Sequence, residues 1–218
     1  MVRLRTARTR TLLLLFCVLL SSPTLFAQSR GKILMILPLS GTSVLVDGKS
    51  DPAFTDFMLT REAQVMKAML QEAGFNVLSA TPSGRLVGGA AVSLQPDLKL
   101  DDVQIADYVG VMVPCMGSND PPNTKAVEIV SQAWKLGKPL AAQNGGVFTL
   151  GAAGVLQGRR FACQPGDAHW VADGIYGGDG VVVDGNVATS GTCPYMAQAN
   201  KKPDGTAELT RKFIALLP

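Results

Sequence analysis

The segment from Leu140 to Gly146, LAAQNGG, is well suited to carry chemistry, because an apolar strand pattern leads directly into a helical one. Small residues at Ala142, Gly145 and Gly146 allow a sharp strand-to-helix turn. Such an elbow raises the residue at its tip above the sheet, beside the N-terminus of the helix. Asn144 is the expected tip, since asparagine tolerates left-handed backbone conformations better than most residues. An Asn-Gly hairpin turn is the alternative, but a helical pattern follows the glycines.

Glu62 is the second candidate for a chemical role. It shares one apolar face of a predicted helix with Met66, Met69, Leu70 and Ala73. A carboxyl group on that face would be partly desolvated, so its pKa would rise. It could then act as an acid or base, or as a protonated hydrogen-bond donor to Asn144. The alternative is an exposed acid that caps the start of the helix.

Three cysteines, Cys115, Cys163 and Cys193, lie at or just after the ends of predicted strands. Because three is an odd number, at most one bridge can form among them within a single chain. Inert buried thiols and a nucleophilic cysteine are the alternatives. No CxxC spacing is present and the only histidine, His169, has no nearby partner, so we expect neither a metal site nor a cofactor.

Residues 1–27 are predicted to be a cleaved Sec signal peptide. An arginine-rich start precedes the apolar run from Leu12 to Leu20, and a cleavage site is expected between Ala27 and Gln28. The run is too short for a stable membrane span, and no later segment reaches the roughly 18 apolar residues that a span needs. An uncleaved anchor is the alternative, because Leu25 is bulky for its position. We therefore expect a secreted or periplasmic domain formed by residues 28–218.

The composition is that of a folded domain. The 218 residues are 47% hydrophobic and 17% charged, which excludes a disordered chain and a coiled coil. Removing the four arginines that precede the apolar run changes the formal charge from +3 to −1. A nearly neutral domain has no electrostatic reason to bind nucleic acid or acidic lipid.

Apolar strand patterns alternate with helical patterns along the chain. We predict strands at Lys32–Pro38, Phe75–Ala80, Val109–Val113, Pro139–Ala142, Arg160–Cys163, Val181–Asp184 and Asn186–Thr189. We predict helices at Arg61–Ala73, Lys125–Leu136, Phe148–Leu156 and Ala207–Leu217. Gly41–Phe57 and Pro82–Asp102 are predicted to be long loops, either binding loops or solvated insertions. This alternation predicts an α/β fold with one doubly wound sheet, helices on both faces, and sites at the carboxyl ends of the strands.

The sequence resembles the DJ-1/PfpI (ThiJ/PfpI) family of the class I glutamine amidotransferase-like superfamily. The resemblance covers roughly Lys32 to Leu217, and rests on segments in the family's order: Gln71–Val77, Asp107–Pro114, Lys138–Gly146, Ala152–Arg159, Cys163–Asp167 and Val183–Ser190. It implies a flavodoxin-like, mostly parallel sheet. Members include glyoxalases, protein deglycases, peptidases, isocyanide hydratases and chaperone-like proteins, and they often form homodimers.

The sequence departs from the family at the residues that the resemblance would make catalytic. Asn144 stands where the family has its reactive cysteine, and Gly145 stands where a histidine often follows. A carboxamide has no accessible anion near neutral pH, so it cannot replace a thiolate. Cys115 and Met116 replace the paired glycines that commonly follow the strand-end proline. Glu62 matches the family's acid.

Two functions follow from this pattern. The first is a pseudoenzyme, either a chaperone-like or a non-covalent binding protein, whose pocket beside Glu62, Asn144 and Gly145 takes a small polar molecule or a peptide segment. The alternative is a glyoxalase-, deglycase- or hydrolase-like enzyme that uses Glu62 with a relocated cysteine, Cys115 or Cys193. Since the resemblance also assigns Cys163 and Cys193 to the site region, we predict a disulfide between them that leaves Cys115 free.

Overall fold

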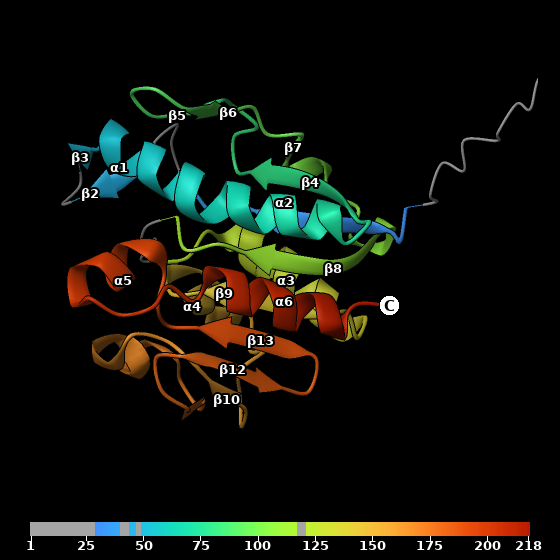
Figure 1. The fold of residues 1–218 in the computed structure, drawn as a ribbon. Coiled ribbons are helices and arrows are strands. Elements are labelled where there is room, and N and C mark those ends of the chain that lie inside the picture. Colours follow the sequence, from blue (N-terminus) through green and yellow to red (C-terminus); the bar gives the residue numbers. More distant parts are fainter. Residues whose placement is uncertain (1–28, 40–43, 47–48, 117–120) are drawn as a thin grey trace, which may run out of the picture.

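The computed structural model describes residues 29–39, 44–46, 49–116 and 121–218; the predicted signal peptide lies outside these ranges. A seven-stranded sheet forms the centre, in the order β12-β13-β9-β8-β1-β4-β7 (Figure 1). Its strands are β1 (Lys32–Ile36), β4 (Asn76–Thr81), β7 (Leu98–Lys99), β8 (Tyr108–Val113), β9 (Leu140–Gln143), β12 (Val181–Asp184) and β13 (Val187–Ser190). All neighbours are parallel except β12 and β13, which form an antiparallel hairpin.

Helices cover both faces of this sheet. One face carries α2 (Gln64–Glu72) and α6 (Thr206–Leu216), and the other carries α3 (Thr124–Lys135) and α4 (Gly145–Ala152). Strand β1 shows why both faces are needed: Ile33 and Met35 pack in one apolar cluster, whereas Leu34 and Ile36 pack in the other. A strand buried on both sides has a continuous apolar sequence. The predicted doubly wound, flavodoxin-like architecture is confirmed.

The helix that carries Glu62 is longer than predicted. It begins with α1 (Pro52–Met58), continues through a π-helical turn (Leu59–Ala63) and ends as α2. The side chain of Asp51 caps it by accepting a hydrogen bond of 2.8 Å from the backbone N–H of Phe54, and Pro52 takes the first helical position. The prediction of a loop up to Phe57 was therefore wrong. Glu62 lies inside the helix and not at its start, so the capping alternative was also wrong.

Smaller elements account for the other differences. The predicted loop Pro82–Asp102 contains short strands, and Asp56 of α1 fixes it by accepting hydrogen bonds of 2.8 Å from the N–H groups of Ala91 and Val92. The short elements are β2 (Leu45–Val46), β3 (Lys49–Ser50), β5 (Val87–Gly88), β6 (Ser93–Leu94), β10 (Arg160–Phe161), β11 (Ile175–Tyr176), α5 (Pro194–Asn200) and 3₁₀ turns at Leu100–Asp102, Ile105–Asp107 and Pro165–Trp170.

Strand β10 does not join the central sheet, as the predicted strand Arg160–Cys163 would have done; it pairs with β11 instead. Helix α5 was missed. None of the described helices is both long and apolar enough to cross a membrane.

Candidate functional site

The site lies at the carboxyl ends of β8, β9 and β13, the end of the sheet at which α5 is placed in Figure 1. The sequence order of the strands reverses between β1 and β8, next to this site, because β4 and β8 lie on opposite sides of β1. Crevices at such switch points are the usual ligand sites of doubly wound sheets. Three strand ends and the long helix bring together side chains from distant parts of the chain: Glu62, Cys115, Asn144 and Cys193.

The predicted elbow is present at Asn144. Its backbone has φ 41° and ψ −107°, between the end of β9 and the first residue of α4. The N–H of Asn144 donates to the carbonyl of Ser190 at 2.6 Å, which ties the turn to β13. Gly146 is required because a Cβ there would lie 2.3 Å from the carbonyl oxygen of Val113. The hairpin alternative was wrong, since α4 follows directly.

The side chain of Asn144 is directed to Cys193. Its Nδ2 donates to Cys193 Sγ at 3.6 Å, while its Oδ1 is buried and has no hydrogen-bond partner among the described residues. Only 8% of the residue is exposed. A buried acceptor without a partner is costly, so this oxygen is available to a donor from a small molecule.

Glu62 is fully buried and faces the end of β8. Its Oε1 accepts from the N–H of Cys115 at 2.9 Å and its Oε2 from the N–H of Met116 at 3.3 Å. The predicted hydrogen bond to Asn144 is therefore replaced by two bonds to backbone amides. Burial, followed by the nearby charge of Cys193, raises the pKa of Glu62 well above its ordinary value, although the two amides oppose this shift. Glu62 is therefore a buried carboxyl group at the site whose raised pKa favours the protonated form.

Met116 was recognised in the sequence as a departure from the family's glycine, but its contact with Glu62 was not predicted. It has φ 41°, an uncommon conformation for a residue with a side chain, and this conformation turns its N–H toward Glu62. The glycine that the family commonly has at this position would adopt the same backbone at no steric cost. The two amides at this strand end bind Glu62, so they do not form a free oxyanion hole.

Cys115 and Cys193 are in contact. The Cys115 thiol donates a hydrogen bond to the sulfur of Cys193, and the N–H of Gly145 donates to the sulfur of Cys115. Cys193 immediately precedes α5; its sulfur makes no capping hydrogen bond, but the backbone amides of Tyr195 and Met196 lie close enough to influence its pKa. The elbow thus lies between two thiols and contacts both of them.

The pKa values of the two thiols are shifted in opposite directions. The hydrogen bond from Cys115, together with the nearby Met196 amide, the Asn144 side chain and the Tyr195 amide, lowers the pKa of Cys193 to about 7 against the effect of burial. The pKa of Cys115 is raised well above its usual value, first because its proton is shared with Cys193 and then by burial. Cys193 is therefore the thiolate of the pair, and Cys115 keeps its proton.

Cys163 does not join this pair. All three described cysteines are buried free thiols, so the predicted Cys163–Cys193 disulfide is not present. Because β10 leaves the central sheet, the backbone of Cys163 packs on Gly191, where an added Cβ would lie 2.4 Å from it. The Cys163 thiol turns away and donates to the carbonyl of Gln164 at 3.2 Å. Burial, and then the charge of Asp167, raises its pKa to about 12.

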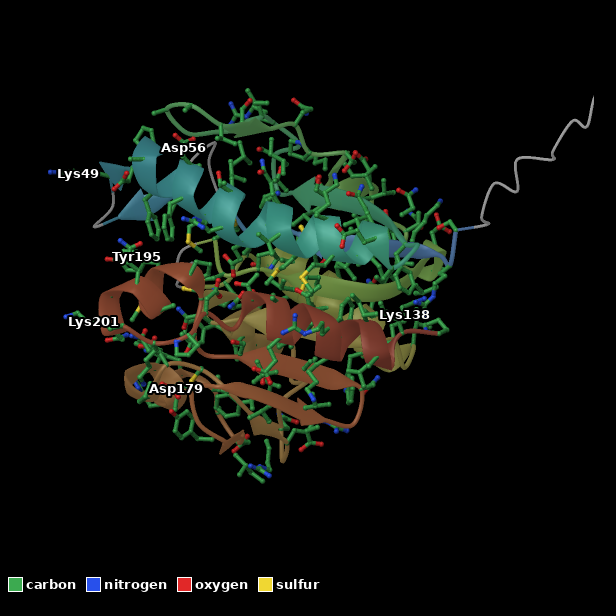
Figure 2. The ribbon with its side chains drawn as sticks, in the orientation of Figure 1. Lys49, Asp56, Lys138, Asp179, Tyr195 and Lys201 are labelled. Atoms are coloured by element: carbon green, nitrogen blue, oxygen red, sulfur yellow. The ribbon has the colours of Figure 1, made fainter. Side chains whose placement is uncertain are left out.

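Two hollows flank α5, the helix that follows Cys193. One, of about 280 Å³, is polar at its rim, where Lys202 and Asp179 form an ion pair, and it reaches Thr192 and Met196. The other, of about 310 Å³, lies where Phe54 of α1 meets Tyr195. Tyr195 and Asp179 are labelled at this end of the molecule in Figure 2.

No cluster of His, Cys, Asp or Glu suited to a metal ion is found among the residues that the structure describes. His169 lies in a 3₁₀ turn and stacks on Trp170, with ring centroids 4.7 Å apart. The donor set at the site, two thiols and one carboxyl group bound to backbone amides, is suited to thiol chemistry instead.

The family follows from comparison with known proteins. The model of the DJ-1/PfpI family matches residues 54–202, which include the helix with Glu62, the elbow and both interacting thiols. The chain belongs to the DJ-1/PfpI family. A relative from Pyrococcus abyssi named a deglycase is 34% identical over 155 residues, or 68% of this chain and 86% of the relative. A protein from Archaeoglobus fulgidus is 39% identical over 128 residues, or 56% of this chain and 75% of that protein.

Solved structures show the same fold at low identity. A ThiJ/PfpI domain protein from Brachyspira murdochii superposes with a TM-score of 0.64 at 14% identity, covering 87% of this chain and 96% of its own. Drosophila melanogaster DJ-1beta superposes with a TM-score of 0.55 at 19% identity, covering 85% of this chain and 96% of its own. In this DJ-1/PfpI chain, the acidic thiol follows β13, and the elbow residue is a hydrogen-bond donor to it.

Proposed function

We propose that this DJ-1/PfpI protein is a thiol-dependent enzyme in which Cys193, and not the elbow residue, attacks a small carbonyl compound. The observation that carries the proposal is the contact of 3.6 Å between Asn144 Nδ2 and Cys193 Sγ. It puts a sulfur of lowered pKa next to the elbow tip, where the family's enzymes have their cysteine. The name deglycase, borne by relatives from two Pyrococcus species, supports a glyoxalase- or deglycase-like reaction.

The proposed chemistry follows from the charges of the site. With a pKa of about 7, roughly half of the Cys193 thiols are ionised at neutral pH. The thiolate adds to the carbonyl carbon, a C–S bond forms, and the C=O double bond becomes a single bond to an anionic oxygen. The Nδ2 of Asn144, which donates to the resting sulfur, is a donor beside the reacting atom, and the raised pKa of Glu62 makes this carboxyl group a nearby source of a proton.

Burial limits the size of the substrate. Cys193 is 1% exposed and Cys115 is 4% exposed, so a protein side chain on a folded partner cannot reach the sulfur, whereas a molecule of a few atoms can. We therefore propose a small polar carbonyl compound as substrate and no nucleic-acid partner, in a domain that could also form a homodimer, as members of the family often do.

The experiment is the pH dependence of methylglyoxal consumption by the reduced protein without added cofactor. We expect kcat/KM to rise with pH through a midpoint near 7, because the thiolate form of Cys193 is the reactive one. Activity that does not follow a group titrating in this range would contradict the assignment of Cys193. If the reduced protein consumed no methylglyoxal, the proposal that it is an enzyme would be contradicted.

Non-covalent binding is the second candidate, and the unpaired Oδ1 of Asn144 favours it. A ligand N–H or O–H that reached this oxygen would gain a buried hydrogen bond. The same experiment separates the two candidates. A pseudoenzyme would leave methylglyoxal unconsumed and would be stabilised against heat by small amides or polyols.

We also propose that the protein is exported, because four arginines precede the apolar run from Leu12 to Leu20. Mass spectrometry of periplasmic or secreted material should show a mature chain that starts at Gln28. Recovery of the chain with Met1 from the cytoplasm of the native host would contradict this proposal.

A further inference from the structure

We propose that Cys115 and Cys193 form a peroxide-reactive dithiol that closes to an intramolecular disulfide. The inference uses the Cys193 thiolate of the proposed function, but it does not depend on carbonyl chemistry. It starts from a contact between two sulfur atoms whose residues are 78 positions apart in the sequence. Neither residue lies in a CxxC motif, so no local pattern indicates the pair.

The strand order creates the pair. Cys115 follows β8 and Cys193 follows β13, and β9 lies between these strands in the sheet. The elbow after β9 therefore lies between the two thiols, with the Gly145 N–H on one sulfur and the Asn144 amide on the other. Cys115 and Cys193 lie in the segments that follow β8 and β13, so closing a bond of about 2.05 Å requires these two segments to bring their sulfurs together.

The two thiols are unequal, as a reactive and a resolving cysteine must be. Cys193 accepts a hydrogen bond of 3.6 Å from the Asn144 side chain and one from the Cys115 thiol, which together favour its thiolate, so it is the nucleophile. Cys115 is protonated and touches the sulfur that would be oxidised, so it is the resolving thiol. The Cys163 thiol donates a hydrogen bond to the carbonyl of Gln164 and takes no part.

The reaction balances with a hydroperoxide as oxidant. The Cys193 thiolate attacks the terminal oxygen, the O–O bond breaks, an S–O bond forms, and an alcohol or water leaves after taking up a proton. The sulfur of Cys115 then attacks the sulfenic sulfur of Cys193. An S–S bond forms, the S–O bond breaks, and the hydroxyl group leaves as water with the proton of Cys115. In sum, two thiols are oxidised and one hydroperoxide is reduced.

The burial of Cys193 favours a small hydroperoxide as the oxidant. With Cys193 1% exposed, hydrogen peroxide, which is nearly as small as water, reaches the sulfur more readily than a disulfide of glutathione size. The same burial protects a sulfenic acid from larger thiols, so the neighbouring Cys115 is the available partner.

The test is intact mass spectrometry of the reduced protein after one equivalent of hydrogen peroxide. We expect the wild type to lose about 2 Da and to regain it with dithiothreitol, and peptide mapping to join Cys115 to Cys193. Cys115→Ser should instead accumulate a sulfenic acid that dimedone traps. Cys193→Ser should react at least tenfold more slowly and form no bridge. Cys163→Ser, the matched control, should behave like the wild type.

Three outcomes would contradict the proposed disulfide. The first is a bridge that contains Cys163, and the second is a bridge that still forms in Cys193→Ser. The third is a wild-type protein that accumulates sulfinic acid in place of the disulfide. Methylglyoxal consumption by the reduced protein, measured before peroxide is added, keeps the two proposals apart. A protein that is inactive when reduced but forms the bridge with peroxide refutes the enzyme and supports the dithiol, whereas a reduced protein that is active but never forms the bridge does the reverse.

Discussion

Replacing Cys193 by serine should abolish carbonyl turnover, with a loss of kcat/KM on the order of 100-fold or more. A serine hydroxyl is not ionised near neutral pH, so the hydrogen bonds that stabilise the Cys193 thiolate have no anion to act on. Serine is close to cysteine in size and can keep the contact with Asn144. The loss would then report chemistry and not folding.

The matched control is Cys163→Ser. Cys163 is also buried, but its thiol bonds to the carbonyl of Gln164, and a serine hydroxyl can make the same bond. We expect kcat/KM of this variant to stay within about twofold of the wild type. Equal losses in the two variants would show that any buried cysteine is needed for the fold, and would remove the support for Cys193 as nucleophile.

Two substitutions of Cys115 form a third part of this experiment. Its hydrogen bond is the largest influence that lowers the pKa of Cys193. Cys115→Ala removes the donor and should move the midpoint of the pH profile upward, because the thiolate loses stabilisation. Cys115→Ser retains an O–H donor and should move the midpoint less. If neither substitution moved the midpoint of the pH profile, the assignment of the titration to Cys193 would be contradicted.

The central strands and the elbow could be predicted from the sequence, because they depend on apolar runs and on the spacing of glycines. The central strands β1, β4, β8 and β9 were placed to within two residues, since they are largely buried on both faces and their sequences are mostly apolar. The elbow was predicted from Gly145 and Gly146, because only small residues permit that turn. Helix α5 was missed because its seven residues are too few for a periodic pattern, and α1 was missed as the first part of the long helix that continues into α2.

The thiol pair could not be predicted, because it depends on strand order. That Cys115 would meet Cys193 and not Cys163 follows from the position of β9 between β8 and β13, and from β10 leaving the central sheet. Neither feature has a local sequence signal. The pair Cys193-Pro194 was the one available clue, since a small residue before proline is typical of a helix start, and a helix start favours a thiolate nearby.

Gly146→Ala should destabilise the protein by about 3 kcal/mol, lowering the melting temperature by roughly 6–12 °C. The new Cβ would lie 2.3 Å from the carbonyl oxygen of Val113 and 2.9 Å from that of Pro114, and backbone atoms cannot rotate away as a side chain can. To relieve this contact, α4 must move from the end of β8. Such a shift would carry Asn144 away from Cys193, so the pKa of Cys193 should rise as well.

Gly151→Ala is the matched control, because Gly151 lies in the same helix and a Cβ there would meet only the side chain of Val171, at 3.4 Å. Alanine is favoured over glycine inside a helix by about 1 kcal/mol, so this variant should melt at or slightly above the wild-type temperature. Thermal unfolding followed by circular dichroism measures both variants, and alkylation rates against pH report Cys193. If Gly146→Ala melted like Gly151→Ala and left the alkylation midpoint near 7, the close contact between elbow and strand end would not position the thiol, and Asn144 would lose its assigned role.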